Sequence, residues 1–227
     1  MPTHLLALDT GSPLVSVALA RDGAVVASRA VEQERSSTRL LAMVREVLDE
    51  AGIGTGDLSS IAVLRGPGSF TGLRIGLATA LGLHQALGIP ATALPSLQAL
   101  ALSAGTAGRV IAAVDALRGD WSAQAFEDGR PTDEMELVPG PELPRLAGGV
   151  EAVVTGFGVS RLREIPGWSA DLRLLEPGPL APAAALLAAS PGTVWDPALL
   201  TSAIYSRPPA ISLPKKRLPK PRVPALT

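Results

Sequence analysis

The sequence has no cysteine among its 227 residues. This absence excludes disulfide bonds, thiolate zinc sites and a cysteine nucleophile. Histidine is scarce as well, since only His4 and His84 occur, and neither lies at ligand spacing from a second histidine or a carboxylate. The sequence therefore predicts no metal site.

Charged side chains are missing from residues 75–108, which contain no Asp, Glu, Lys or Arg. A stretch of this kind can mark a membrane span. Here Gly88, Pro90 and Pro95 divide it into pieces that are too short to cross a bilayer. We expect a buried helix, a strand and a second helix instead. Asp9 interrupts the first apolar run, which argues against a secretion signal and favours a cytoplasmic protein.

Acidic side chains are absent from residues 206–227, which carry six basic residues and six prolines. The preceding chain has 14 basic and 21 acidic residues, a net charge of -7. This change in composition predicts an extended, mobile tail. Two roles stay open for Lys215 to Arg222: contact with RNA phosphates that weakens with salt, or a solubilising end.

The central stretch, residues 61–87, combines a short apolar run, a glycine turn and a long apolar segment. The pattern predicts a buried strand over residues 61–64 and a helix that begins after Ser69 or Thr71 and ends at Gly88. Small residues recur every four positions along this helix, which lets another backbone come close. They are Gly72, Gly76 and Ala80.

The order of predicted elements occurs twice. The first copy has strands near residues 4–8, 15–20 and 24–31, a helix from Ser36–Thr38 to residue 51, the central strand and helix, a strand at 91–94 and a helix that Ser96 caps. Strands near 110–114, 121–126, 134–138 and 151–155 and a helix at 182–189 form a degenerate second copy. Two tandem β-β-β-α-β-α lobes resemble the actin, sugar kinase and Hsp70 (ASKHA, RNase H-like) fold. We expect an N-terminal lobe over residues 1–106, a C-terminal lobe with a closing helix over 107–205, and the tail over 206–227.

Several turns have the composition of phosphate sites. The turn Asp9-Thr10-Gly11-Ser12 has three interpretations: an inherited structural turn, a weak phosphate site in which the carboxylate reaches hydrated magnesium, or the catalytic turn of an aspartic protease. The glycines that precede the central helix suit tight packing or an anion site. At Asp115, bulky residues follow where a phosphate turn needs glycine. The candidate phosphate or nucleotide contacts are Asp9, Thr10, Gly11, Ser12, Gly66, Gly68 and Asp115.

The eleven residues Gly66-Pro67-Gly68-Ser69-Phe70-Thr71-Gly72-Leu73-Arg74-Ile75-Gly76 closely resemble the signature of the TsaB (YeaZ) family, a subunit of the bacterial tRNA threonylcarbamoyladenosine machinery. Weaker likenesses lie at Leu8-Asp9-Thr10, Asp115 with Arg118-Gly119, Gly156-Phe157-Gly158, Asp196-Pro197 and Tyr205-x-Arg207. The chain departs from the family at Ser36-Ser37, where many relatives have His-Ser, and at Asp115-Ala116-Leu117, where they have Asp-Ala-Arg.

The resemblance implies a non-catalytic scaffold that binds the catalytic paralogue TsaD or a second copy of itself, with the ATPase TsaE joining the pair and tRNA held mainly through the complex. It implies no catalytic residue and no required cofactor, with ATP or ADP and magnesium at the complex interface as the open alternative. The resemblance implies that the first two helices form the interface, and the wide apolar face of the first helix and the small-residue stripe of the second suit that role. The residues expected there are Leu40, Met43, Val44, Val47, Gly72, Leu73, Gly76, Leu77 and Ala80. The competing hypothesis is an enzyme of this fold, a small-molecule kinase or other ATP-binding enzyme, or a peptidase.

Overall fold

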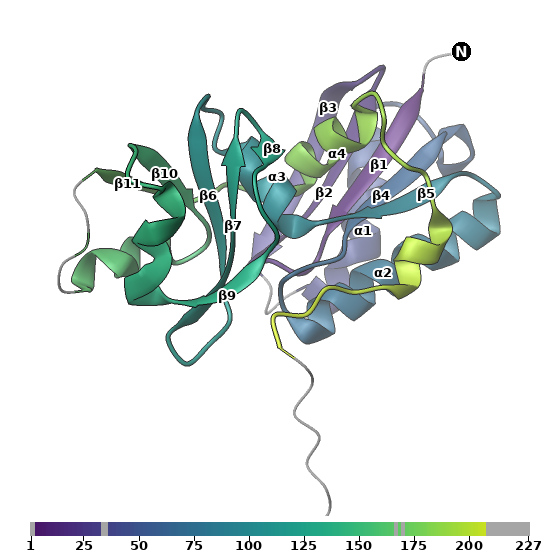
Figure 1. The fold of residues 1–227 in the computed structure, drawn as a ribbon. Coiled ribbons are helices and arrows are strands. Elements are labelled where there is room, and N and C mark those ends of the chain that lie inside the picture. The colour runs from purple at the N-terminus through teal and green to yellow at the C-terminus, as the bar shows by residue number, and fades with distance from the viewer. Residues whose placement is uncertain (1–2, 33–35, 166–167, 169–170, 208–227) are drawn as a thin grey trace, which may run out of the picture.

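The computed structural model describes residues 3–32, 36–165, 168 and 171–207. Two mixed sheets lie beside each other and form two lobes (Figure 1). Most of the expected tail, including Lys215 to Arg222, lies outside the described residues. No helix within the described part of the chain is both long and apolar enough to cross a bilayer.

The first lobe is built on a five-stranded sheet in which β1 is the central strand. In spatial order its strands are β3 (Ala24–Glu32), β2 (Leu14–Arg21), β1 (His4–Asp9), β4 (Ser60–Leu64) and β5 (Ala91–Leu94). The first three strands pair antiparallel, and β1, β4 and β5 pair parallel. Every residue of β1 is buried. Both faces of the sheet are covered, which explains why these strands read as continuous apolar runs rather than as alternating ones.

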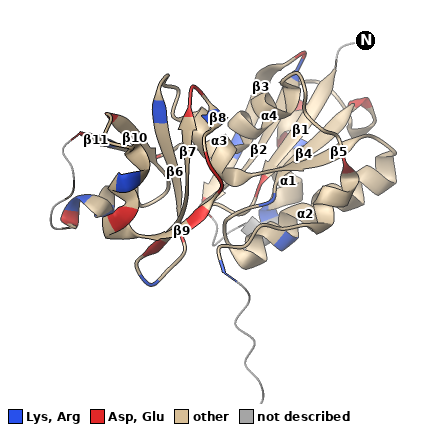
Figure 2. Ribbon diagram, viewed as in Figure 1, with Lys and Arg blue, Asp and Glu red and all other residues tan. Residues whose placement is uncertain are grey.

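Helices cover both faces of this sheet. The helices α1 (Ser36–Glu50) and α2 (Phe70–Leu87) pack on the face to which Leu6 and Leu8 point. The helices α3 (Ser96–Ser103) and α4 (Ala181–Ala189) pack on the opposite face, with Leu5 and Ala7. Figure 2 shows few charged residues on the strands of this lobe, as expected for a sheet enclosed on both sides.

The position of the closing helix α4 differs from the predicted domain division. It falls within the predicted C-terminal lobe, residues 107–205, but it packs back onto the first sheet, as the resemblance to the actin-like fold implies for the last helix. The Ala181 amide donates a 3.0 Å hydrogen bond to the Ser16 hydroxyl on β2. Phe126, from the second lobe, joins the same hydrophobic cluster as α3 and α4. The two lobes therefore share one core layer, and residues 181–207 return to the first lobe.

The second lobe is a reduced copy of the first. Its sheet has the order β11 (Leu172–Leu175), β10 (Ala152–Thr155), β6 (Arg109–Asp115), β7 (Asp120–Glu127) and β8 (Arg130–Pro131), and β9 (Glu136–Pro139) also pairs with β7. Short 3-10 helices, Gly140–Ala147 and Val159–Glu164, stand where the repeat predicts α-helices. Pro144 lies inside the first of these and lacks the N–H that an α-helix needs at this position.

The local signals at both ends of α2 correctly predicted where that helix begins and ends. The Ser69 hydroxyl caps α2 by accepting from the Gly72 amide at 3.3 Å, and Gly88 ends the helix with a φ of 66°. The prediction that Ser96 caps α3 was wrong. Its hydroxyl instead accepts a hydrogen bond from the Gly66 amide at 3.2 Å, and so ties α3 to the glycine turn after β4.

Candidate functional site

A cavity of about 690 Å³ lies between the two lobes. The turns that follow β1, β4, β6 and β10 form most of its wall, and the last described segment of the chain closes one side. In open α/β sheets ligands bind outside the carboxyl ends of the strands, which is where this cavity lies. The described residues that line it are Gly11, Ser12, Pro13, Pro67, Gly68, Ser69, Phe70, Ser96, Leu100, Val114, Asp115, Ala116, Leu117, Phe157, Leu180, Tyr205, Ser206 and Arg207.

Four of the seven predicted phosphate contacts line this cavity: Gly11, Ser12, Gly68 and Asp115. Three do not: Asp9, Thr10 and Gly66. Sequence reasoning missed much of the wall, because Leu100 and Leu180 belong to no motif, and it did not place Phe157 there although Phe157 lies in the matched Gly156-Phe157-Gly158 turn. It also missed Arg207 and Tyr205 as wall residues, although both belong to the matched Tyr205-x-Arg207 ending.

Asp9 lies beneath the wall of the cavity. Its side chain is fully buried, and its Oδ1 atom accepts a 3.0 Å hydrogen bond from the Gly11 amide. Its Oδ2 atom has no hydrogen-bond partner within the part of the chain that is described. Burial raises the pKa of Asp9 to about 6, and hydrogen bonds from Ser12 and Gly11 oppose that rise in part. Of the three interpretations of this turn, the burial of Asp9 favours the inherited structural turn, because a side chain without exposed surface does not reach hydrated magnesium in the cleft.

Thr10 and Gly66 are held by packing within the first lobe. The Thr10 hydroxyl donates a 2.8 Å hydrogen bond to the carbonyl oxygen of Gly72 on α2. Gly66 has a φ of 110°, and a Cβ at this position would overlap the carbonyl oxygen of Ile204. A Cβ at Gly68 would lie 2.7 Å from the Gly11 carbonyl oxygen. These glycines are required because three chain segments approach one another closely, which is the packing interpretation of the turn.

The anion-binding positions of the second lobe hold the chain's own carboxylates. Asp115 accepts a 2.7 Å hydrogen bond from the Leu117 amide and a second one, also 2.7 Å, from the Arg161 guanidinium. Glu176 accepts from the amides of Gly158, at 2.8 Å, and Ser160, at 3.0 Å. Partial burial acts to raise the pKa of Glu176, but these backbone hydrogen bonds outweigh it, so the pKa lies below its ordinary value.

The predicted partner interface has to be corrected, because all nine of its residues are buried within this chain. Leu40, Met43, Val44, Val47, Leu73, Leu77 and Ala80 are each at most 5% exposed, and Gly72 and Gly76 are buried as well. The small-residue stripe faces the sheet: a Cβ at Gly76 would overlap the Thr10 hydroxyl. These residues form the core face of α1 and α2. A partner surface on the same two helices would have to use their outward faces.

Comparison with known proteins identifies the family. A family model described as TsaD, tRNA N6-adenosine threonylcarbamoyltransferase, matches residues 20–135. The tRNA threonylcarbamoyladenosine biosynthesis protein TsaB of Escherichia coli (strain K12) is 37% identical over 147 residues, 62% of this chain and 64% of that protein. A Pseudomonas aeruginosa crystal structure, described as similar to the peptidase YeaZ, superposes with a TM-score of 0.73 and 31% identity over 90% of this chain and 100% of that one. The chain belongs to the TsaB (YeaZ) family.

The likeness to TsaB is uneven along the chain. The chain spans about half to two thirds of the length of the curated TsaB proteins it matches, with 64%, 49% and 51% covered in three of them. The match to the TsaD model runs from β2 to β8, across the junction of the two lobes. Component A of the (R)-2-hydroxyglutaryl-CoA dehydratase of Acidaminococcus fermentans is only 14% identical, over 82% of this chain and 98% of that one, with a TM-score of 0.54. This likeness shows the fold alone. The predicted fold class, tandem lobes of the actin type, is confirmed.

Proposed function

We propose that this chain takes part in tRNA threonylcarbamoyladenosine biosynthesis in the cytoplasm as a non-catalytic scaffold, by binding TsaD. The observation that carries the proposal is the likeness, over 90% of the chain, to a structure described as similar to the peptidase YeaZ, together with the TsaB name of the curated relatives. The cleft supports a non-catalytic role, because Asp9 is buried below it and Asp115 is held by Arg161. A kinase or peptidase needs a reactive carboxylate or base at the substrate.

The partner surface we propose is the outward side of α1 and α2, which cover the same face of the first sheet (Figure 1). Leu41 on α1 is 64% exposed and would offer a partner a large apolar side chain. Arg74, Ala78 and Gly82 recur every four residues on the exposed side of α2. Ala78 and Gly82 are small, so a partner helix could approach closely there.

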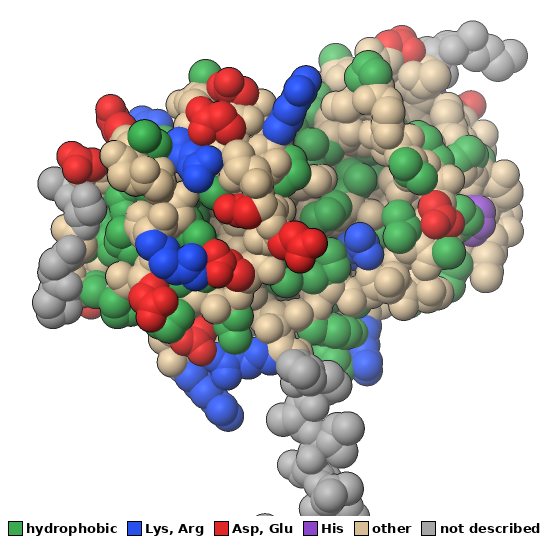
Figure 3. All heavy atoms as spheres, in the orientation of Figure 1, with side chains coloured by type: hydrophobic (Ala, Val, Ile, Leu, Met, Phe, Trp, Pro, Cys, Tyr) green, Lys and Arg blue, Asp and Glu red, His purple; other side chains and the backbone are tan. Residues whose placement is uncertain are grey.

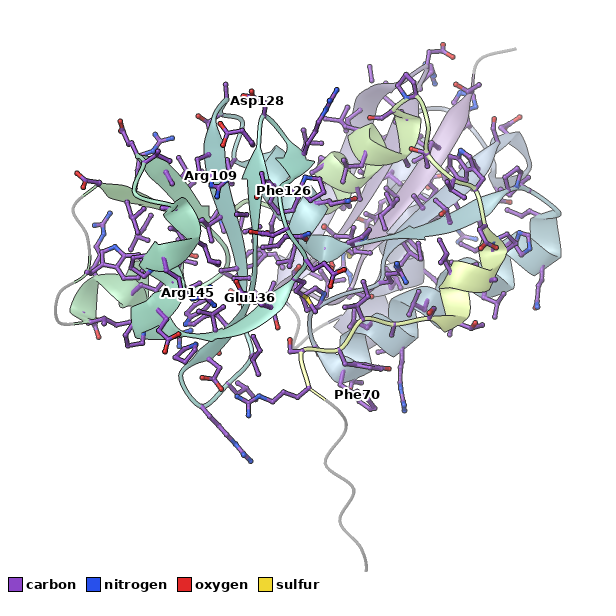
Figure 4. All side chains as sticks on the ribbon, viewed as in Figure 1. Phe70, Arg109, Phe126, Asp128, Glu136 and Arg145 are labelled. Atoms are coloured by element: carbon purple, nitrogen blue, oxygen red, sulfur yellow. The ribbon has the colours of Figure 1, made fainter. Side chains whose placement is uncertain are left out.

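Contact with tRNA is assigned to the complex and not to the described surface of this chain. Figure 3 shows acidic and basic side chains interspersed over the second lobe. Arg145 and Glu136, which form an ion pair of 2.5 Å, are an example from this lobe (Figure 4). Mixed charge gives little of the uniform positive potential that phosphate binding requires. TsaE and a homodimer through the same helices belong to this proposal as further partners.

The first experiment measures binding to TsaD. Leu41→Arg and Ala78→Arg are each expected to weaken co-purification with TsaD by roughly 30-fold or more, the scale of an interface hot spot. Leu186→Arg is the matched control, because Leu186 is an exposed leucine, 42% accessible, on α4 at the opposite face of the sheet. Normal binding by both interface variants would refute the assigned surface.

The second experiment measures the function itself. Purified TsaD, TsaE, ATP, threonylcarbamoyl-adenylate and tRNA are assayed for modified adenosine with and without this chain. We expect product only when the chain is present, and none from the chain alone. Product formation that is indifferent to the chain would refute the scaffold role, and product from the chain alone would make it the enzyme.

A further inference from the structure

The cavity between the lobes has the position of a nucleotide cleft, but backbone amides in three of the turns that form or adjoin its wall already donate to carboxylates of the chain. The Gly11 amide donates to Asp9, the Leu117 amide to Asp115, and the Gly158 amide to Glu176. Each of these turns follows a strand of the sheet, where backbone N–H groups ordinarily cradle a phosphate. A phosphate would have to displace a carboxylate of the chain and would meet its charge. The residues present therefore do not fit a nucleoside triphosphate with magnesium.

The charged groups at the cavity wall are paired with each other or with neighbours. Asp115 pairs with Arg161 at 2.7 Å, and Arg207 forms an ion pair with Asp120. Each pair leaves little net charge to face a ligand, so a charged molecule would gain little there while it lost its own hydration.

Most of the remaining wall is apolar. Pro13, Leu100, Val114, Phe157 and Leu180 contribute to it from five separate segments of the chain. A volume of about 690 Å³ lies in the range of pockets that enclose drug-sized molecules. An apolar molecule would be removed from water on most of its surface in such a cavity, which is the main source of affinity for uncharged ligands.

Hydroxyl groups supply the polar contacts at the edges. The Ser69 oxygen accepts from the Gly72 amide and the Ser96 oxygen accepts from the Gly66 amide. A hydroxyl that accepts in this way still has a hydrogen to donate. Tyr205 adds a third hydroxyl at the mouth, where its ring lies 5.1 Å from that of Phe70. Figure 4 shows Phe70 at the start of α2, near the end of the described chain. These edges suit hydrogen-bond acceptors such as a carbonyl or an ether oxygen.

We propose that the cleft binds an uncharged, largely apolar small molecule that carries hydrogen-bond acceptors, and that it excludes nucleoside triphosphates. This proposal does not depend on the scaffold role, although the two surfaces meet at Arg74, which contacts Phe70 and Tyr205 of the cavity wall. At the wall itself, Asp115 would place a carboxylate against a phosphate, and the buried carboxylate of Asp9 lies beneath the neighbouring turn.

The test uses the full chain and Nile red, an uncharged heteroaromatic dye with a carbonyl acceptor whose fluorescence rises in apolar surroundings. We expect saturable binding of one dye per chain. Pro13→Trp, at an exposed position of the rim, and Ala116→Phe, inside the wall, should each weaken binding by about tenfold or more. Pro191→Trp is the matched control, because Pro191 is also exposed but lines a separate cavity beside β5.

A competition experiment decides between the ligand classes. Millimolar ATP with magnesium should leave the dye signal unchanged. Displacement of the dye by ATP, or dye binding that neither cleft variant alters, would overturn the proposal. Circular dichroism checks that each variant is folded. If Ala116→Phe unfolds, the exposed Pro13→Trp variant alone gives the answer.

Discussion

The Thr10 hydroxyl donates a 2.8 Å hydrogen bond to the carbonyl oxygen of Gly72, 62 residues away in the sequence. This contact joins the turn after β1 to the first turn of α2. It also brings the Thr10 side chain against Gly76, where a Cβ would overlap the hydroxyl oxygen. Gly76 is therefore needed for the close contact between α2 and the turn after β1 within one chain.

Gly76→Ala should destabilise the protein even though alanine is the better helix former. The added Cβ forces Thr10 or the helix to move, and overpacking of this kind costs about 1–3 kcal/mol. Gly82→Ala is the control on the same helix, because a Cβ at Gly82 meets no atom within 4 Å. It should stabilise by up to about 1 kcal/mol. Urea unfolding of both variants measures the difference, and equal midpoints would contradict this account of the stripe.

Val44→Asp should unfold the chain and not merely prevent pairing. Val44 is 4% exposed, and a carboxylate there would lose its hydration without a partner. The expected cost is several kcal/mol, a large part of the stability of a typical domain. Leu41→Asp, three residues away on the exposed side of α1, should leave the unfolding midpoint nearly unchanged. If the Val44→Asp variant folds with normal thermal stability, the conclusion that Val44 is a core residue is wrong.

Asp9 should make the protein more stable as the pH falls through 6. Its folded pKa of about 6 lies above the ordinary value of 3.8, so the folded state binds the proton more tightly than the unfolded chain. Its contribution therefore rises as the pH drops from above 6 toward 4, by about 3 kcal/mol at most. Asp9→Asn should raise stability at pH 7 and remove this part of the pH dependence. Urea unfolding between pH 4 and 8 tests it, and parallel curves for the two proteins would argue against a buried, ionisable Asp9.

Glu176→Gln should loosen the turn between β10 and the 3-10 helix that follows it. The side chain of glutamine lacks the negative charge that strengthens the hydrogen bonds from the backbone amides of Gly158 and Ser160. A loss of about 1 kcal/mol is expected at pH 7, reduced by the exposure of the group. Because the pKa of Glu176 is lowered, its contribution is present above the ordinary pKa and is lost as the pH falls through the folded value. Glu164→Gln, at an exposed position nearby, is the control, and equal effects of the two changes would contradict the assigned contacts.

The sequence was sufficient for the helices and strands of the first lobe and for the fold class, but not for the 3-10 helices or for β8 and β11 of the second lobe. Apolar runs such as residues 61–64 and the signals at Ser69 and Gly88 act over a few residues, so they are legible without a structure. The repeated order of strands and helices indicated the two lobes. The signature from Gly66 to Gly76 identified the family, although the close contacts that require its glycines come from distant segments at Gly11 and Ile204.

Only the tertiary structure decided which side of each element faces inward. The apolar face of α1 would have the same sequence pattern whether a sheet of its own chain or a partner protein covered it. In the structure, the sheet of its own chain covers it. Glu176 and Gly158 are 18 residues apart, and no local sequence pattern indicates that the Glu176 carboxylate accepts a hydrogen bond from the Gly158 amide. The return of α4 to the first lobe likewise depends on contacts between distant segments. Burial and the pairing of charges are properties of the folded arrangement, so the character of the cleft could be determined only from that arrangement.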